Sequence, residues 1–246
     1  METYQLKRSK RKSLSIVIGR DGIIQVKAPD WLPKHQIDQF IRQKSDWIEE
    51  KRSELHTRQQ QKPVHTFREG DCFLIGGETY RLEFLKSFPS EQQTGKPPGV
   101  ILDHEKKMIL MEAADFGQVK RKLEEWYIQQ ARQIFSRQVG LYYPLVVQLA
   151  SASGKEIGPV NRIAIRNQKT RWGSCSSRGN LNFNWRLVMA PKEILDYVTV
   201  HELCHLAYLN HSVQFWKLVE QILPDCRERR SWLKTNSMLL DWEEKG

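Results

Sequence analysis

The sequence has few cysteines and no long apolar run. Its 246 residues include 4 cysteines, which are too sparse and too unevenly spaced for a disulfide scaffold. No stretch approaches the roughly 18 consecutive apolar residues of a membrane-spanning helix. The basic cluster near the amino terminus is not followed by the apolar segment of a secretory signal. We therefore expect a reducing, cytoplasmic setting and no membrane partner.

Internal repeats, a glycine-rich phosphate loop and recognisable nucleic-acid-binding motifs are also missing. The formal net charge is nevertheless +10, which suits nucleic acid, other polyanions or an acidic protein surface. Much of the excess lies in the run Lys7–Lys12, and such runs usually form a solvated segment. Binding of nucleic acid through this basic amino-terminal segment is therefore one hypothesis among several.

The length favours two domains. We expect a mixed α/β module over residues 1–112 and a second domain over residues 113–246. In the first module, the runs Ser13–Gly19 and Ile23–Ala28 flank an Asp-Gly pair, which is a strong signal for a β-hairpin. A helical pattern that includes Trp47 then opens at Pro33.

The second domain is expected to begin with a long amphipathic helix that starts near Asp115 and ends close to Gly140. The segment Asn180–Trp185 alternates apolar residues with asparagines and is the clearest strand in the chain. Pro191 then opens a helix that continues into a pair of histidines. Two further helical segments follow, over residues 213–223 and 227–240.

The chemistry of the chain is concentrated in His201-Glu-Leu-Cys-His205. Residues four apart share one helix face, so His201 and His205 can reach a single ion while Glu202 stays free to act on a water molecule. A zinc ion in such a site lowers the pKa of its water towards about 7 and polarises a scissile carbonyl. We therefore predict a zinc-dependent hydrolase with Glu202 as general base. Cys204 lies between the ligands and is expected to be buried packing.

Catalytic zinc usually takes three protein ligands, so a third donor is needed. His211 lies at the spacing of the metzincin pattern, but Tyr208 stands where that pattern has a glycine. The turn must then be made differently, and Asn210 is a candidate because it tolerates left-handed geometry. Glu220 and Glu228 are the rival third ligands.

The sequence resembles the YgjP-like metallopeptidases, which are relatives of the SprT-like and WLM families among the gluzincin-type zinc proteases. The resemblance rests on Arg171-Trp-Gly-Ser-Cys175, on Leu181–Trp185, on the histidine motif and on Asn210-His-Ser212 with Phe215-Trp216. It implies an α+β fold with a minimal zincin-like core, in which a small sheet packs on the active-site helix. It also implies proteolytic activity, with His211 as the third ligand.

Several residues are candidates for contact with a peptide or protein substrate. If Asn180–Trp185 lies at a sheet edge, an extended peptide could add to it as another strand, beside Asn182 and Asn184. The alternative is an interior strand with exposed asparagines. Arg171 and Trp172 lie at a glycine turn where they could line the cleft, and Tyr208 could stabilise an oxyanion or simply pack.

Two other functions compete with simple proteolysis. A metal-activated water also attacks phosphorus, so a metal-dependent nucleotide hydrolase that cleaves phosphoanhydrides is one alternative. A protease associated with DNA through the basic segment is the other. A purely structural zinc site is disfavoured because it would be closed by four protein ligands and would not need Glu202.

Overall fold

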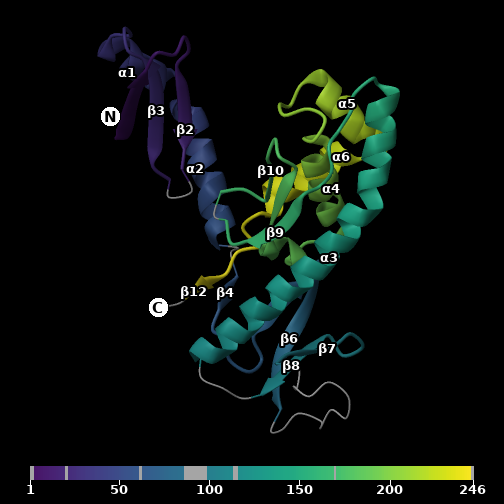
Figure 1. Ribbon diagram of the computed structural model, residues 1–246. Helices are drawn as coiled ribbons and strands as arrows, with labels where there is room; N and C mark the ends of the chain where they lie inside the picture. The colour runs from purple at the N-terminus through teal and green to yellow at the C-terminus, as the bar shows by residue number, and fades with distance from the viewer. Residues whose placement is uncertain are drawn as a thin grey trace. The chain divides into compact units, whose positions relative to one another are not determined.

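The structure is a computed structural model that describes residues 3–19, 22–60, 63–85, 99–112, 116–168 and 170–244. The chain forms two compact units, Met1–Lys62 and Pro63–Gly246. Both units combine helices with small sheets (Figure 1), so the predicted α+β class is confirmed. Among the described helices, none combines the length and the apolar character needed to cross a bilayer.

The first unit packs two helices on a three-stranded sheet. Its strands are β1 (Tyr4–Ser9), β2 (Ser15–Ile18) and β3 (Ile24–Pro29), and its helices are α1 (Lys34–Gln43) and α2 (Ser45–Gln60). The central strand β3 is parallel to β1 and antiparallel to β2. Apolar side chains from the sheet and both helices form its core: Ile24, Val26, Ala28, Ile37, Ile41 and Ile48.

The predicted hairpin is confirmed by the pairing of β2 with β3, in which Ile18 lies opposite Ile24. The helical pattern that opens at Pro33 forms two helices, because Lys44 leaves the helical region with φ −107° and ψ 12°. After this break Ile48 continues the buried stripe, whereas Trp47 is 39% exposed.

The basic run is partly structured. Its first residues, Lys7 and Arg8, belong to strand β1, which the sequence did not predict. The Arg8 guanidinium donates hydrogen bonds of 2.8–3.0 Å to the carbonyls of Pro29, Asp30 and Leu32. This cation therefore fastens the chain after β3, while the side chains of Lys7 and Arg8 are exposed, as a solvated segment predicts.

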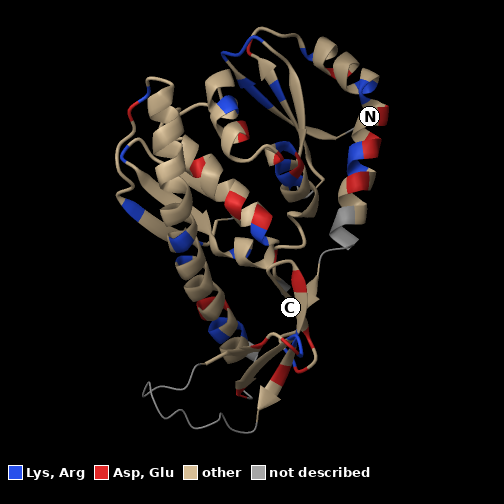
Figure 2. Ribbon diagram, turned by 90° about the vertical axis from the view of Figure 1, so that its right-hand side faces the viewer, with Lys and Arg blue, Asp and Glu red and all other residues tan. Residues whose placement is uncertain are grey.

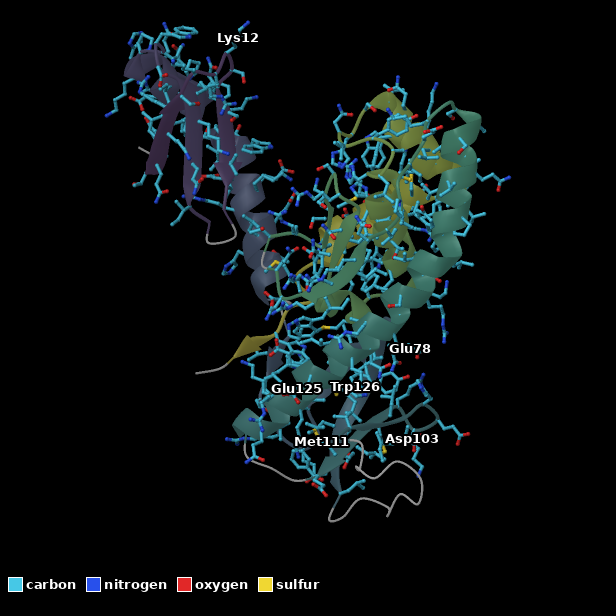
Figure 3. The ribbon with its side chains drawn as sticks, in the orientation of Figure 1. Lys12, Glu78, Asp103, Met111, Glu125 and Trp126 are labelled. Atoms are coloured by element: carbon cyan, nitrogen blue, oxygen red, sulfur yellow. The ribbon has the colours of Figure 1, made fainter. Side chains whose placement is uncertain are left out.

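The second unit begins with a four-stranded sheet and a long helix. These elements are β4 (Val64–His65), β5 (Cys72–Ile75), β6 (Glu78–Leu85), β7 (Ile101–Asp103), β8 (Met108–Glu112) and α3 (Phe116–Ala152). The sheet has the order β5-β6-β8-β7, in which β6 and β8 are parallel. The first turns of α3 cover it with Val119, Leu123 and Trp126, and Figure 3 labels Met111 of β8 just below Trp126 of α3.

The rest of the second unit carries the histidine motif. Its elements are β9 (Arg162–Arg166), β10 (Gly173–Cys175), β11 (Asn180–Asn184), the 3-10 helix η1 (Trp185–Met189), α4 (Lys192–Cys204), α5 (Val213–Ile222), α6 (Cys226–Asn236) and β12 (Glu243–Glu244). The sheet has the order β10-β11-β9. The short strand β12 pairs with β4.

Two predicted helix ends are wrong. Helix α3 passes through Gly140 and continues to Ala152, because Val146 and Ala150 of its later turns are buried in the main core. The last helix ends at Asn236, not at residue 240. The capping residue proposed at the start of α3, Asp115, lies outside the described residues.

Strand β11 is central in its sheet, so the hypothesis that Asn180–Trp185 forms an edge is wrong. It pairs with β10 on one side and with β9 on the other. The predicted alternation is correct, because Leu181, Phe183 and Trp185 are buried. The edge of this sheet beside α4 is formed by β10.

Hydrogen bonds tie the β5–β6 hairpin to the segment that leads into α4. The N–H groups of Gly76 and Gly77 donate to the carbonyls of Val188 and Met189 at 2.8 and 2.9 Å. The hydroxyl of Tyr127 donates to a carbonyl of β5 at 2.7 Å. The compact units divide at residue 62, and a functional domain boundary after residue 112 stays a prediction.

The contact between Gly77 and the start of α4 predicts a position-specific loss of stability. Gly77 has a φ of +85°, and a Cβ there would lie 2.8 Å from Cγ of Pro191. We expect Gly77→Ala to lower the free energy of unfolding by about 3 kcal/mol or more. The cost of a left-handed backbone at alanine adds to the cost of the overlap between its Cβ and Pro191. Gly76→Ala, also left-handed but with open space around it, should cost only about 1–2 kcal/mol. Urea unfolding measures both, and equal losses would contradict the contact.

Candidate metal centre

Helix α4 and the turn after it position the histidine motif. The helix starts directly after Pro191, and His205 is its C-cap residue with φ −67° and ψ −17°. The N–H groups of Ala207 and Tyr208 both donate to the carbonyl of Cys204, which closes the last turn. His201 and His205 therefore lie on one helix face, as their spacing predicts.

His211 returns to the site just before helix α5 begins. The hydroxyl of Ser212 caps that helix by accepting a hydrogen bond of 3.3 Å from the N–H of Phe215. Among the described residues, positive φ outside glycine occurs only at Phe67 and Lys107. The proposal of a left-handed Asn210 is therefore wrong, and the turn is made with ordinary backbone angles.

The three imidazoles converge. One ring nitrogen from each of His201, His205 and His211 lies within 4.8 Å of the other two, and Nε2 of His211 is 3.0 Å from Nε2 of His201. The centres of the three rings are 4.8–4.9 Å apart. The rivals Glu220 and Glu228 are not members of this cluster, and Glu220 accepts hydrogen bonds from Arg227 instead.

The hydrogen bond of His205 fixes its tautomer. Its Nδ1 lies 2.9 Å from the carbonyl oxygen of Tyr208. Because a carbonyl only accepts, Nδ1 carries a proton, and in the neutral ring Nε2 is then the nitrogen with the free lone pair. A main-chain carbonyl that orients the second nitrogen in this way is typical of metal-ligating histidines.

Burial keeps the other two imidazoles neutral. It lowers the pKa of His201 to about 3, and the neighbouring histidines and Arg230 act in the same direction. Burial also lowers the pKa of His211, helped by the charges of His205 and Arg230. At neutral pH these two rings therefore do not hold a second proton that would compete with a cation.

Aromatic rings of α5 support the cluster from one side. Phe215 is fully buried, and its ring centre lies 4.6–4.9 Å from those of all three histidines. Trp216 stacks on His211 at 5.7 Å, and the guanidinium of Arg230 lies over Trp216. These contacts restrict the histidine rotamers, which favours a preformed site.

The donor set fits a metal ion such as zinc. Zinc–imidazole bonds of about 2.0–2.1 Å in tetrahedral geometry bring ligand nitrogens to about 3.4 Å from one another. The Nε2 atoms of His201 and His211 are at nearly this separation. Three histidines are one of the protein donor sets found in catalytic zinc sites.

Glu202 lies beside the cluster in a confined position. Its side chain is 5% exposed, and burial raises its pKa to about 8 against the opposing positive charge of Arg171. A Cβ on Gly173 would lie 2.5 Å from Oε1 of Glu202 and 2.7 Å from its Cγ. The carboxyl group therefore packs directly against the backbone of β10, at a position that only glycine fits.

A cavity of about 220 Å³ opens at this point. Its walls include Trp172, Gly173 and Tyr197, and both His201 and Glu202 line it. The sequence-predicted Trp172 thus lies at the site. The exposed Arg171 is close enough to act on the charge of Glu202.

The two predicted asparagines lie elsewhere. The side chain of Asn182 hydrogen-bonds to those of Ser174 and Arg166. Ser174 is its partner on β10 and points to the opposite face of the sheet from its neighbour Gly173, which adjoins Glu202. Asn182 and Ser174 therefore both face away from Glu202. Asn184 is 2% exposed, and its amide donates to the carbonyls of Gln168 and Arg171. Its position indicates that it holds the loop before β10, and does not support direct contact with a substrate.

Tyr208 and Cys204 have packing roles in this structure. Tyr208 packs against the main core, with Nζ of Lys155 5.7 Å from its ring centre, and its carbonyl is the group that reaches His205. Cys204 is fully buried, as predicted. Gly173 lies in the Arg171–Cys175 motif and Phe215 in the Phe215-Trp216 motif. The motifs alone did not predict that these residues contact Glu202 and the histidines, because folding brings the contacting segments together.

Comparison with known proteins agrees with this geometry. A family model described as YgjP-like, metallopeptidase domain, matches residues 12–236. The chain belongs to the YgjP-like family. This membership supports a metal-dependent peptidase in general terms. The searches of curated proteins and of solved structures gave no significant match.

The convergence of His201, His205 and His211 predicts that this YgjP-like protein binds one divalent metal ion per chain. Elemental analysis after equilibration with zinc should give a stoichiometry near one, and His211→Ala should weaken binding by at least about 100-fold, because even outer partners of ligands contribute about 10- to 100-fold. His35→Ala is the matched control, since His35 is an exposed histidine of the first unit. Unchanged affinity in the His211 variant would exclude it as a ligand.

Proposed function

We propose that this chain is a zinc-dependent endopeptidase with a minimal zincin-like core, in which His201, His205 and His211 hold the metal. The observation that carries the proposal is the convergence of three imidazole nitrogens within 4.8 Å beside the buried carboxyl group of Glu202. A structural metal site has no need of a free carboxyl group next to its ligands. The family description supports a peptide as the substrate.

The chain's own residues account for the proton transfers. A bound zinc ion supplies a Lewis acid that polarises the scissile carbonyl and acidifies water. Glu202 accepts a proton from the attacking water and then returns it to the leaving amine. A divalent cation nearby favours the ionised form of a carboxyl group, which brings the raised pKa of Glu202 towards the range that a general base requires.

Strand β10 is the best candidate for binding an extended substrate. The carbonyl of Trp172 and the N–H of Ser176 both bond to β11. In an antiparallel pair, every second residue of a strand bonds to its partner strand, and the residues between them direct their main-chain N–H and C=O groups to the opposite edge. Gly173 and Cys175 therefore offer N–H and C=O groups at the free edge, and Gly173 adjoins Glu202. A peptide paired there would bring its main chain to the metal centre.

The alternatives gain no support from the described residues. The sequence lacks a glycine-rich phosphate-binding loop, which disfavours a nucleotide hydrolase. Basic and acidic side chains are interspersed along helices such as α2 (Figure 2), and the basic run uses Arg8 for a structural contact. Proteolysis without nucleic acid is therefore the simpler proposal.

Replacement of the proposed base should separate catalysis from metal binding. We expect Glu202→Gln to reduce peptide hydrolysis by about 100- to 10,000-fold, the range that general acid–base catalysis usually contributes. It should retain the metal, because Glu202 is not one of the converging donors. Casein and nucleoside triphosphates should be assayed in parallel, with and without chelator. Chelator-sensitive phosphate release without casein cleavage would favour the nucleotide hydrolase instead.

Gly173 provides a second test that does not alter any ionisable group. The Cβ of Gly173→Ala would overlap Glu202, so the carboxyl group must move and hydrolysis should fall by about 100-fold. Metal affinity should change little, because the histidines are not displaced. Ser174→Ala is the matched control on the same strand, on the face away from Glu202. Full activity in the Gly173 variant would show that the placement of Glu202 is not critical.

A further inference from the structure

Helix α6 carries a cation close to the metal centre that the proposed proton transfers do not use. The guanidinium of Arg230 lies 4.9 Å from the ring centre of Trp216, and that ring stacks on His211 at 5.7 Å. Burial lowers the pKa of both His201 and His211, and the positive charge of Arg230 acts in the same direction. The charge of Arg230 therefore reaches the imidazoles that would hold the metal.

The spacing along α6 directs Arg230 to the cavity beside Glu202. Leu233 lines this cavity together with His201 and Glu202. Because residues three apart share one helix face, Arg230 lies on the face that α6 presents to the cavity. Tyr197 of α4 also lines it, and the charge of Arg230 opposes the rise in the pKa of Tyr197 that burial causes. Arg230 is exposed, so its side chain can turn towards an occupant of this cavity.

Arg230 differs from the neighbouring arginines of α6 because no acidic side chain among the described residues pairs with it. The guanidinium of Arg227 lies 2.8 Å from Glu220, and that of Arg229 lies 2.9 Å from Asp225. Within the described parts of the chain, Arg230 forms no ion pair, and its contact is with an aromatic ring. The N–H donors of its guanidinium are therefore available to an anion.

An anion at this place would relieve an electrostatic conflict. A metal dication on the three histidines would repel the charge of Arg230. Arg171, another exposed cation at the site, already has an acidic neighbour, because its charge opposes the rise in the pKa of Glu202 that burial causes. A carboxylate brought by the substrate would offset the repulsion at Arg230, and a guanidinium can hold a carboxylate through two parallel hydrogen bonds.

We propose that Arg230 binds a carboxylate of the substrate close to the cleaved bond. This inference rests on the proposed peptidase function and adds the substrate class, namely peptides that carry an anion beside that bond. The same anion comes from two sources, an acidic side chain or the C-terminal carboxylate of a short peptide. In either case Arg230 is a specificity-determining residue, which the sequence analysis did not single out.

The test uses fluorogenic peptides in matched pairs. One pair is amidated at the C terminus and carries Glu or Gln at a single position on either side of the scissile bond. The other pair carries Gln there and ends, close to that bond, in a free carboxylate or an amide. The zinc-loaded full chain should cleave the anionic member of at least one pair with a kcat/KM about 10-fold above that of its neutral counterpart, because a hydrogen bond to a charged group contributes about this factor or more. The pair that responds identifies the source of the carboxylate.

Substitutions on α6 assign the preference to Arg230. In Arg230→Gln the ratio of the two kcat/KM values should fall to about one. Lys234→Gln is the matched control, because it removes one exposed positive charge from the same helix, and it should leave the ratio unchanged. A purely structural role for Arg230 behind Trp216 would lower both values together and leave their ratio intact.

The outcomes separate this inference from the proposed function. Equal cleavage of both members in each pair, or a preference that Arg230→Gln leaves unchanged, overturns the carboxylate site and keeps the peptidase. If no peptide is cleaved, the proposed function fails, and fluorescence anisotropy with zinc-loaded Glu202→Gln then tests the site by itself. That variant should bind the anionic peptide of one pair about 10-fold more tightly than its neutral counterpart, and the added Arg230→Gln change should remove the difference. Equal binding overturns the inference.

Discussion

The way in which helix α4 ends determines whether the chain has a metal centre. The helix presents His201 within its last turn and His205 at its C-cap. The carbonyl of Tyr208, which the closing turn brings back, fixes the ring of His205 with one nitrogen free. The same turn directs the chain back to His211. A longer helix would have carried the third histidine away from the other two, since each further residue adds about 1.5 Å along the axis.

The remainder of the second unit holds this helix in place from three directions. Phe215 packs under the histidines, Gly173 of β10 adjoins Glu202, and Gly77 of the β5–β6 hairpin abuts Pro191 at the start of α4. Because both glycines bring a backbone against another element, the helix cannot move towards either without overlap. Rigid surroundings of this kind favour a preformed site over one assembled by the metal.

The sequence predicts the parts of this site that depend on local spacing. The i, i+4 histidines and the N-terminal position of Pro191 follow from helix geometry, and the alternation of β11 follows from strand geometry. It does not predict which strand is the edge, because strand order depends on pairing between distant segments. Asn184 is an example. The alternating pattern of β11 predicts that this asparagine faces outward, but the loop before β10 covers it, and its amide donates hydrogen bonds to carbonyls of that loop.

The helix ends show the same limit. Gly140 and Pro144 both lie inside α3, although each disfavours a helix interior. Burial of Val146 and Ala150 in the main core compensates, because tertiary packing outweighs local propensity of about 1–3 kcal/mol. Local signals are therefore weakest where a helix spans two cores, as α3 does from Val119 in one to Ala150 in the other.

The electrostatics of the site follow from burial more than from charged neighbours. Desolvation is the largest influence on the pKa of both His201 and Glu202, and it lowers the first and raises the second. Both shifts favour uncharged groups, so the pocket presents neutral donors and a carboxyl group that resists ionisation. A bound dication would shift this balance for the carboxyl group, because a nearby positive charge favours the ionised form. In the proposed mechanism, binding of the metal and ionisation of Glu202 are therefore coupled.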